Sequence, residues 1–224
     1  MSEKKQITIL IVATLFLGLT ALLLLPSGPI IFEGDLVVEE YVVTLFPDGT
    51  LTESYTYEVK KSGQYRMLFR FWDDPLSFKS LESPYIEFVS VKHPPGTIGY
   101  AKDHKGNTII YGDESYSSII DSLAYKNEVG AYNPSYYNKG KYKLEFKYIL
   151  HPPIQYDDEV SHLNLKLLRE HVPLRNFKII LPREYIVKVY PRPPNLEIFD
   201  DENNIFITGK SPENELLEVE LLLV

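Results

Sequence analysis

The sequence predicts an all-β protein, an antiparallel β-sandwich preceded by one N-terminal transmembrane helix. Three observations lead to this fold class. A single long uncharged segment lies near the N-terminus, a hydrophobic period of two dominates the rest of the chain, and 16 Pro and 12 Gly punctuate its short apolar runs. Tyrosine, which favours strands, occurs 17 times against 2 methionines.

The N-terminal segment is predicted to cross a membrane. Residues 7–25 carry no charge and, as a helix, would extend about 28 Å, close to the roughly 30 Å hydrocarbon thickness of a bilayer. Lys4 and Lys5 precede the segment and acidic residues follow it, so the positive-inside rule puts the N-terminus in the cytoplasm. We predict a cytoplasmic tail at 1–6, a signal anchor in the lipid bilayer at 7–25, a linker at 26–34 and an extracytoplasmic β-sandwich at 35–224.

The same N-terminal segment is compatible with three further roles. A cleaved secretory signal usually has a shorter apolar region and a small-x-small cleavage site, neither of which is clear here. A pilin-type leader requires a small residue before Gln6, where this chain has Lys5. A buried core helix is the third alternative. The expected location is the cell membrane, with a single pass and the C-terminal domain outside the cytoplasm.

Composition excludes several classes of protein. The chain has no cysteine, which rules out a disulfide scaffold, a zinc ribbon, an iron–sulfur cluster and a thiol nucleophile. Residues 26–224 carry 21 basic and 30 acidic side chains, a formal charge of −9. Nucleic acid is therefore not an expected partner, because affinity for phosphate backbones depends mostly on Lys and Arg.

Period-two runs predict about ten short strands. Residues 36–46 and 50–59 form a hairpin around Pro47-Asp48-Gly49, because Pro and Gly suit successive turn positions. The clearest strand is 142–150, where apolar and mostly charged residues alternate. The other expected strands are 64–71, 85–91, 108–111, 177–181, 185–190, 204–208 and 215–223.

Three segments are less regular. Residues 114–126 place apolar side chains on one helical face and are expected to form a short helix. Residues 160–170 fit a strand or a helix, and their alternating leucines favour a strand. Residues 128–141 show no period and are expected to form an ordered surface loop.

Several motifs occur in an order that resembles a known family. They are Phe46-Pro47-Asp48-Gly49-Thr50-Leu51-Thr52-Glu53, Gly63-Gln64-Tyr65-Arg66, Tyr142-Lys143-Leu144-Glu145-Phe146-Lys147-Tyr148, Tyr156-Asp157-Asp158-Glu159 and Phe177-Lys178-Ile179-Ile180-Leu181-Pro182. This order resembles the YciQ-like predicted membrane proteins of bacteria and archaea over residues 35–224. The resemblance implies a β-sandwich outside the membrane and brings no catalytic residues. Because such proteins usually continue into further transmembrane helices, we expect either a short member with one anchor or a fragment.

Acidic clusters at strand ends are the candidate metal ligands. Carboxylate oxygens from converging loops suit calcium, although none of these clusters has the Asp-x-Asp-x-Asp-Gly spacing of a calcium loop. The same carboxylates are also the candidates for a glycosidase pair. The calcium candidates are Asp157, Asp158, Glu159, Asp200 and Asp201, and two further acids lie at Asp73 and Asp74.

Other chemistry-bearing patterns are incomplete. The five histidines lack zinc-ligand spacing, and no Gly-x-Ser-x-Gly elbow is present. Gly209-Lys210-Ser211 looks like the end of a phosphate-binding loop, but position 204 is Asn204 instead of the required glycine. We expect a β-turn there and no cofactor.

Arginines and tyrosines are the candidate interaction residues. Arg66 and Arg70 lie on one strand face about 13 Å apart, which favours separate ion pairs with nearby Glu side chains over joint binding of one anion. Tyr132, Tyr136 and Tyr137 either stack on a sugar or partner, or pack over the sandwich edge.

Taken together, these observations predict a non-enzymatic structural or interaction module of the cell envelope, in contact with other membrane or envelope proteins. Two alternatives remain: a pilin-like surface filament subunit, and an extracellular hydrolase acting on glycan or peptide.

Overall fold

The computed structural model describes residues 3–24, 32–72, 86–151, 154–156 and 160–224. The chain divides into two compact units, Met1–Ile30 and Ile31–Val224. The first contains the helix α1 (Glu3–Leu24). Within the described residues, no helix combines the length and the apolarity needed to cross a membrane. The sequence-based transmembrane assignment therefore stays a prediction.

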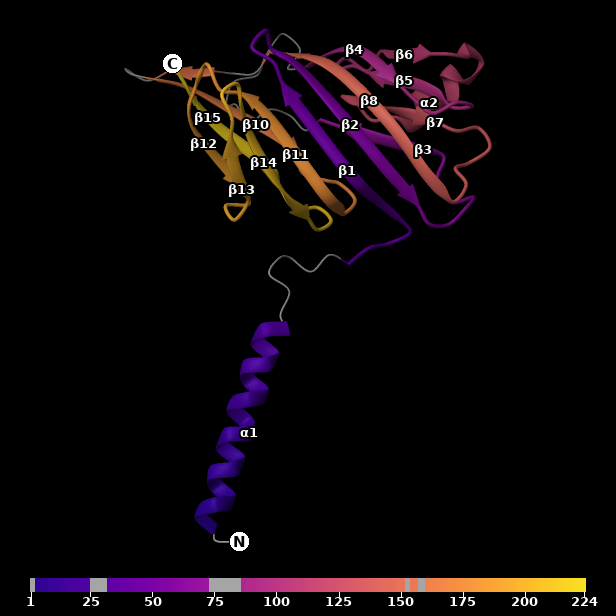
Figure 1. The fold of residues 1–224 in the computed structure, drawn as a ribbon. Coiled ribbons are helices and arrows are strands. Elements are labelled where there is room, and N and C mark those ends of the chain that lie inside the picture. Colours follow the sequence, from indigo (N-terminus) through magenta and orange to yellow (C-terminus); the bar gives the residue numbers. More distant parts are fainter. Residues whose placement is uncertain (1–2, 25–31, 73–85, 152–153, 157–159) are drawn as a thin grey trace. The chain divides into compact units, whose positions relative to one another are not determined.

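The second unit consists of three β-sheets (Figure 1). The large sheet has the order β13-β14-β11-β1-β2-β8-β4, the C-terminal sheet has the order β12-β15-β10-β9, and the middle sheet has the order β3-β7-β5-β6. The large sheet comprises β1 (Leu36–Leu45), β2 (Thr50–Val59), β4 (Ile86–Lys92), β8 (Gly140–Leu150), β11 (Leu174–Pro182), β13 (Glu197–Asp200) and β14 (Asn204–Ser211).

The two smaller sheets are built from shorter strands. The C-terminal sheet comprises β9 (Ile154–Tyr156), β10 (Ser161–Leu168), β12 (Ile186–Arg192) and β15 (Leu217–Leu223). The middle sheet comprises β3 (Met67–Phe71), β5 (Ile98–Lys102), β6 (Thr108–Tyr111) and β7 (Glu128–Tyr132). A 3-10 turn η1 (Glu114–Tyr116) and the helix α2 (Ser117–Leu123) follow β6. The mostly β fold class is thus confirmed.

The predicted hairpin forms because its turn residues and the alternation of its strand both favour this structure. Gly49 adopts a φ of +80°, a left-handed conformation that glycine reaches without strain. The Asp48 side chain accepts a hydrogen bond from the Thr50 amide at 2.9 Å and fixes the turn. Every second residue of β2 is buried, so the large sheet has one inner face.

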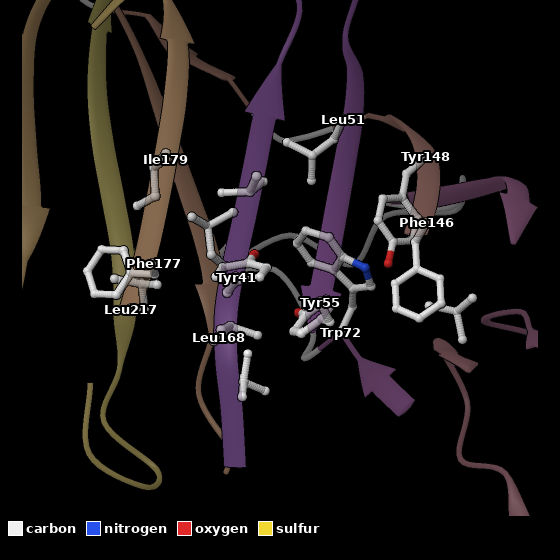
Figure 2. Close-up of a cluster of buried hydrophobic side chains, with 14 of the residues drawn as sticks. Tyr41, Leu51, Tyr55, Trp72, Phe146, Tyr148, Leu168, Phe177, Ile179 and Leu217 are labelled. Carbon is white, nitrogen blue, oxygen red and sulfur yellow. The ribbon is translucent and has the colours of Figure 1, made fainter. Parts of the chain in front are cut away.

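The inner face of the large sheet shares one hydrophobic core with both smaller sheets. The core cluster joins Tyr41 and Phe146 of the large sheet to Leu165 of the C-terminal sheet and Val129 of the middle sheet. Figure 2 shows core side chains of the large and C-terminal sheets together with Trp72, which follows β3. Strand pairing is antiparallel throughout the described ladders except between β1 and β11, which pair in parallel with Tyr41 opposite Phe177.

Two local predictions are wrong. The expected surface loop at 128–141 begins with β7, whose five residues are all buried between β3 and β5. Both faces of β7 are covered, so it has no polar alternation to reveal it. Gly209-Lys210-Ser211 lies in β14 instead of a β-turn. The predicted strand at 160–170 and helix at 114–126 are confirmed as β10 and α2.

Candidate functional site

A buried ion pair lies where the three sheets meet. Leu68 and Arg70 of β3 point inward, while Phe69 between them is exposed. The Nε atom of Arg70 lies 3.2 Å from Oε2 of Glu53 on β2, and only 3% and 0% of the two side chains are exposed. Another Arg70 nitrogen donates to the Leu167 carbonyl of β10. One guanidinium thus contacts all three sheets.

Tyrosine hydroxyls complete the coordination of this pair. Tyr41 donates to Oε1 of Glu53 at 2.6 Å, and Tyr148 donates to Oε2 at 2.7 Å. Burial, together with the nearby Glu53 charge, raises the pKa of both tyrosines well above the usual value. The guanidinium of Arg70 also stacks 3.5 Å from the centre of the Trp72 ring. Because these partners satisfy both charges inside the protein, the cluster helps to hold the three sheets together.

A cavity of about 240 Å³ lies beside this cluster. Its lining is mainly apolar and comes from β1, β2, β3, the end of β10, the start of β11 and the connections β10–β11 and β14–β15, with Arg70 and Tyr55 among the polar members. The Oη atom of Tyr55 is buried without a hydrogen-bond partner. The exposed lining residues are Phe69, Glu170, Glu213 and Asn214, so the cavity opens on their side.

His171 holds the loops at this opening together. Its Nδ1 atom lies 2.7 Å from the Val172 carbonyl oxygen, and its Nε2 atom lies 2.8 Å from the Glu215 carbonyl oxygen. The Asn214 side chain accepts a hydrogen bond from the His171 amide at 3.1 Å. The connection between β10 and β11 is thereby joined to the turn before β15.

The structure separates Arg70 from the other predicted interaction residues. Arg70 is in the core, whereas Arg66 stacks 4.3 Å from the centre of the Tyr136 ring and donates to the Tyr132 hydroxyl at 3.4 Å. Tyr132 and Tyr137 are 1% and 0% exposed, and only Tyr136 reaches the surface. Two of the three tyrosines therefore pack inside the domain.

The predicted calcium ligands are only partly visible. Asp73, Asp74, Asp157, Asp158 and Glu159 lie outside the described residues. Asp200 forms an ion pair with Arg183. The Asp201 side chain accepts hydrogen bonds from the Asn203 and Asn204 amides, and these bonds lower its pKa. In the described part of the chain, no group of three or more His, Asp or Glu side chains is arranged to hold a metal ion.

Sequence reasoning missed the residues around Glu53. Leu51, Glu53, Tyr55 and Tyr57 share the buried face of β2, and that period of two was visible in the sequence. A carboxylate on an otherwise apolar face requires an internal partner. The partner itself, Arg70, comes from another sheet, and strand patterning does not encode this contact.

The fold and this cluster define a mostly β domain built around an internally neutralised charge pair. Residues 38–223 match the family described as Predicted membrane protein (DUF2207) N-terminal domain, and the chain belongs to that family. This match confirms the resemblance to YciQ-like membrane proteins. No curated protein matches the chain.

Solved structures give only distant similarity. An M1 zinc metallopeptidase from Deinococcus radiodurans is 8% identical, with a TM-score of 0.43 over 84% of this chain and 42% of that one. A putative protease from Parabacteroides distasonis is 14% identical, with a TM-score of 0.43 over 85% of this chain and 41% of that one. The chain spans less than half the length of these proteins, and such scores carry no argument about activity.

Proposed function

We propose that this protein is a single-pass membrane protein with its N-terminus in the cytoplasm, whose β domain works outside the cytoplasm as a non-enzymatic interaction module. The family description and the uncharged residues 7–25 after Lys4 and Lys5 support the anchor. The hydroxyls of Thr14 and Thr20 donate to backbone carbonyls four residues earlier, which satisfies them without water.

The observation that carries the interaction role is an apolar pair of sheet edges. β13 ends the large sheet and β12 ends the C-terminal sheet, and the two strands are consecutive in the chain. All four residues of β13 are exposed. Exposed apolar strands at an edge are ready templates for a partner strand. The exposed large side chains here are Tyr185, Val187, Tyr190, Ile198 and Phe199.

Charge argues that this partner is a different chain. If two copies of β13 paired antiparallel with Ile198 opposite Phe199, Glu197 would face Asp200 of the second copy. Like charges directly opposite destabilise a strand pair. A partner strand with basic residues flanking apolar ones avoids this repulsion, and the −9 charge of residues 26–224 favours the same choice.

Photo-crosslinking in the native membrane tests the interaction. Phe199, 49% exposed, is replaced by p-benzoylphenylalanine, and the matched control places the same group at Leu123 of α2, 47% exposed. We expect one discrete cross-linked protein from position 199 that is absent from position 123. Identical patterns at the two positions, or dimers of this chain alone, would contradict the proposed surface.

Topology is tested separately with thiol labelling. The chain has no cysteine, so a single introduced thiol gives a signal without background. In intact cells, a membrane-impermeant maleimide should label Lys105→Cys, at an exposed position between β5 and β6, but not Ser2→Cys. Permeabilised cells should label both. Labelling of Ser2→Cys in intact cells would overturn the proposed orientation.

A further inference from the structure

The cavity beside Arg70 has the composition of a receptor for one side chain. Its volume of about 240 Å³ lies below the roughly 300 Å³ at which pockets begin to take drug-sized ligands. Leu36, Val38, Leu168 and Leu174 supply apolar wall. A single large apolar side chain fits this size and lining better than a cofactor does.

One lining residue of the cavity carries a buried hydroxyl that lacks a hydrogen-bond partner. Arg70 lines the cavity, but Glu53 neutralises it. Tyr55 is 2% exposed, and its Oη atom has no hydrogen-bond partner. Burial raises the pKa of Tyr55 well above its usual value, so the hydroxyl keeps its proton. A buried hydroxyl without a partner is unfavourable, and an occupant with a polar tip would supply the missing hydrogen bond.

The opening of the cavity is acidic. Glu170 and Glu213 are exposed lining residues, and no ion pair engages either of them within the described ranges. Asp35 and Glu213 both act on Tyr65 nearby, where burial and these two charges raise the tyrosine pKa. His171 is the one basic lining residue besides Arg70, and both of its ring nitrogens face backbone carbonyls. A positively charged group beside the occupant is therefore favoured.

We propose that this cavity binds the tyrosine side chain of a partner polypeptide in which lysine or arginine flanks that tyrosine. The aromatic body fills the apolar walls, the phenol tip reaches the Tyr55 hydroxyl, and the flanking cations lie against Glu170 and Glu213. This inference rests on the proposed role as an interaction module and adds a second surface to the β12–β13 edges.

Short peptides test the inference on the full chain in nanodiscs of zwitterionic lipid, with empty nanodiscs as the blank. The probes are acetylated and amidated Lys-Tyr-Lys, Lys-Phe-Lys, Glu-Tyr-Glu and Lys-Ala-Lys, followed by saturation-transfer NMR titration. We expect Lys-Tyr-Lys to bind about fivefold or more tightly than Glu-Tyr-Glu at low salt, a preference that decreases near 1 M salt. Lys-Ala-Lys should show no saturable binding.

Variants assign the binding to the cavity. Tyr55→Phe should abolish the preference for Lys-Tyr-Lys over Lys-Phe-Lys while retaining Lys-Phe-Lys. The double variant Glu170→Gln, Glu213→Gln should abolish the charge preference, whereas the control Glu184→Gln, Glu202→Gln, at exposed sites outside the lining, should keep it. Val172→Phe should block all peptides by filling the cavity. Met67→Trp is the second filling variant if Val172→Phe fails to fold.

The outcomes separate this inference from the proposed function. Equal binding of all four peptides, tighter binding of Glu-Tyr-Glu, or unchanged binding in a folded cavity-filling variant would overturn the inference. None of these results affects the cross-link expected at Phe199, which tests the interaction role independently.

Discussion

Arg70 and Glu53 connect the three sheets through charges that water does not reach. Removing one partner of a buried pair leaves the other charge without compensation. By contrast, Lys92 and Glu145 form an ion pair on the surface, where the Lys92 side chain is 78% exposed. The same chemical interaction therefore has two different energetic consequences in this molecule.

We expect Arg70→Met to lower the free energy of unfolding by about 3–5 kcal/mol, because it leaves Glu53 buried and unpaired. Arg70→Met combined with Glu53→Gln should recover part of that loss, since no charge remains. The measurement is urea unfolding of the full chain in detergent micelles, followed by the fluorescence of Trp72, the single tryptophan, which is 2% exposed.

Lys92→Met is the surface control and should change the free energy of unfolding by less than about 1 kcal/mol. A result in which both single variants lose equal stability would show that the buried pair has no special role.

The buried carboxyl of Glu128 should make the stability of the fold depend on pH. Its carboxyl is 1% exposed and accepts hydrogen bonds from Tyr100 and the Tyr125 amide. Burial raises its pKa from 4.5 to about 7, against the opposing effect of the Tyr100 bond. The folded state then holds a proton that the unfolded state has lost, so this group destabilises the fold as pH rises from about 4.5 to about 7.

The Glu128→Gln variant should remove this dependence. Between a pH of about 5 and a pH of about 8, the unfolding free energy of the variant should rise by about 3 kcal/mol relative to that of the parent. Unfolding of both proteins across that range provides the measurement. Parallel curves for the two proteins would place the titration elsewhere.

Among the strands, β7 contains a position, Gly130, that requires glycine. Gly130 lies between β3 and β5, opposite Phe69 and Tyr100. A Cβ atom on Gly130 would lie 2.6 Å from the Leu68 carbonyl oxygen and 2.7 Å from the Tyr100 hydroxyl oxygen. The glycine is needed for close approach of neighbouring strands.

Gly130→Ala should therefore destabilise the domain by about 1–3 kcal/mol through overpacking. Gly34→Ala is the matched control, because no atom lies within 4 Å of its added Cβ, and it should be neutral. Thermal unfolding of the two variants provides the test. Equal melting temperatures would mean that the middle sheet accommodates the added methyl group without loss of stability.

Elements with one wet face were predictable, and elements without one were not. β8 alternates between buried apolar and more exposed polar residues, and its period alone located it. β7 is covered on both faces and β13 is exposed on both, so neither alternates. The short strand β9 and the buried strand β5 were missed as well. Periodicity reports a difference between two faces, and it fails when the two faces are alike.

The candidate site was less predictable than the strands for a related reason. Residues 66 and 70 were identified from one strand, but their surroundings come from elsewhere: Glu53 from β2, Leu167 from β10 and Tyr136 from the loop before β8. The cavity combines five separate segments. Contacts between sheets depend on tertiary packing, which the spacing within one strand does not encode.

At the scale of the whole β domain, one charged cluster fixes the segment that leads into it. Glu33 accepts hydrogen bonds from Arg175 at 2.5 Å and from Lys60 at 2.6 Å, and Arg175 also lies 2.7 Å from Glu58. The bonds to Arg175 and Lys60 lower the pKa of Glu33 to about 2. The cluster joins residue 33 to β11 and to the end of β2.

Arg175→Met should release this segment. We expect faster amide hydrogen exchange at residues 32–36 in the variant, and the parent should approach the same rates near 1 M salt, where screening is strong. Because the Glu33 pKa is lowered, the stabilisation is complete above a pH of about 4.5 and is lost as pH falls toward about 2. If amide hydrogen exchange at residues 32–36 is unchanged in the variant, backbone contacts alone order this segment.

The parallel pairing of β1 with β11 affects the order in which the domain can assemble. Tyr41 pairs with Phe177, 136 positions later in the chain, and β14 joins the rest of the large sheet only through β11. During synthesis, the first hairpin emerges early and retains an unpaired edge until most of the polypeptide has followed. Long-range pairing of this kind slows folding. Newly made chains are therefore most vulnerable to proteases and to aggregation during that interval, and a holding chaperone would act on the exposed edge of β1.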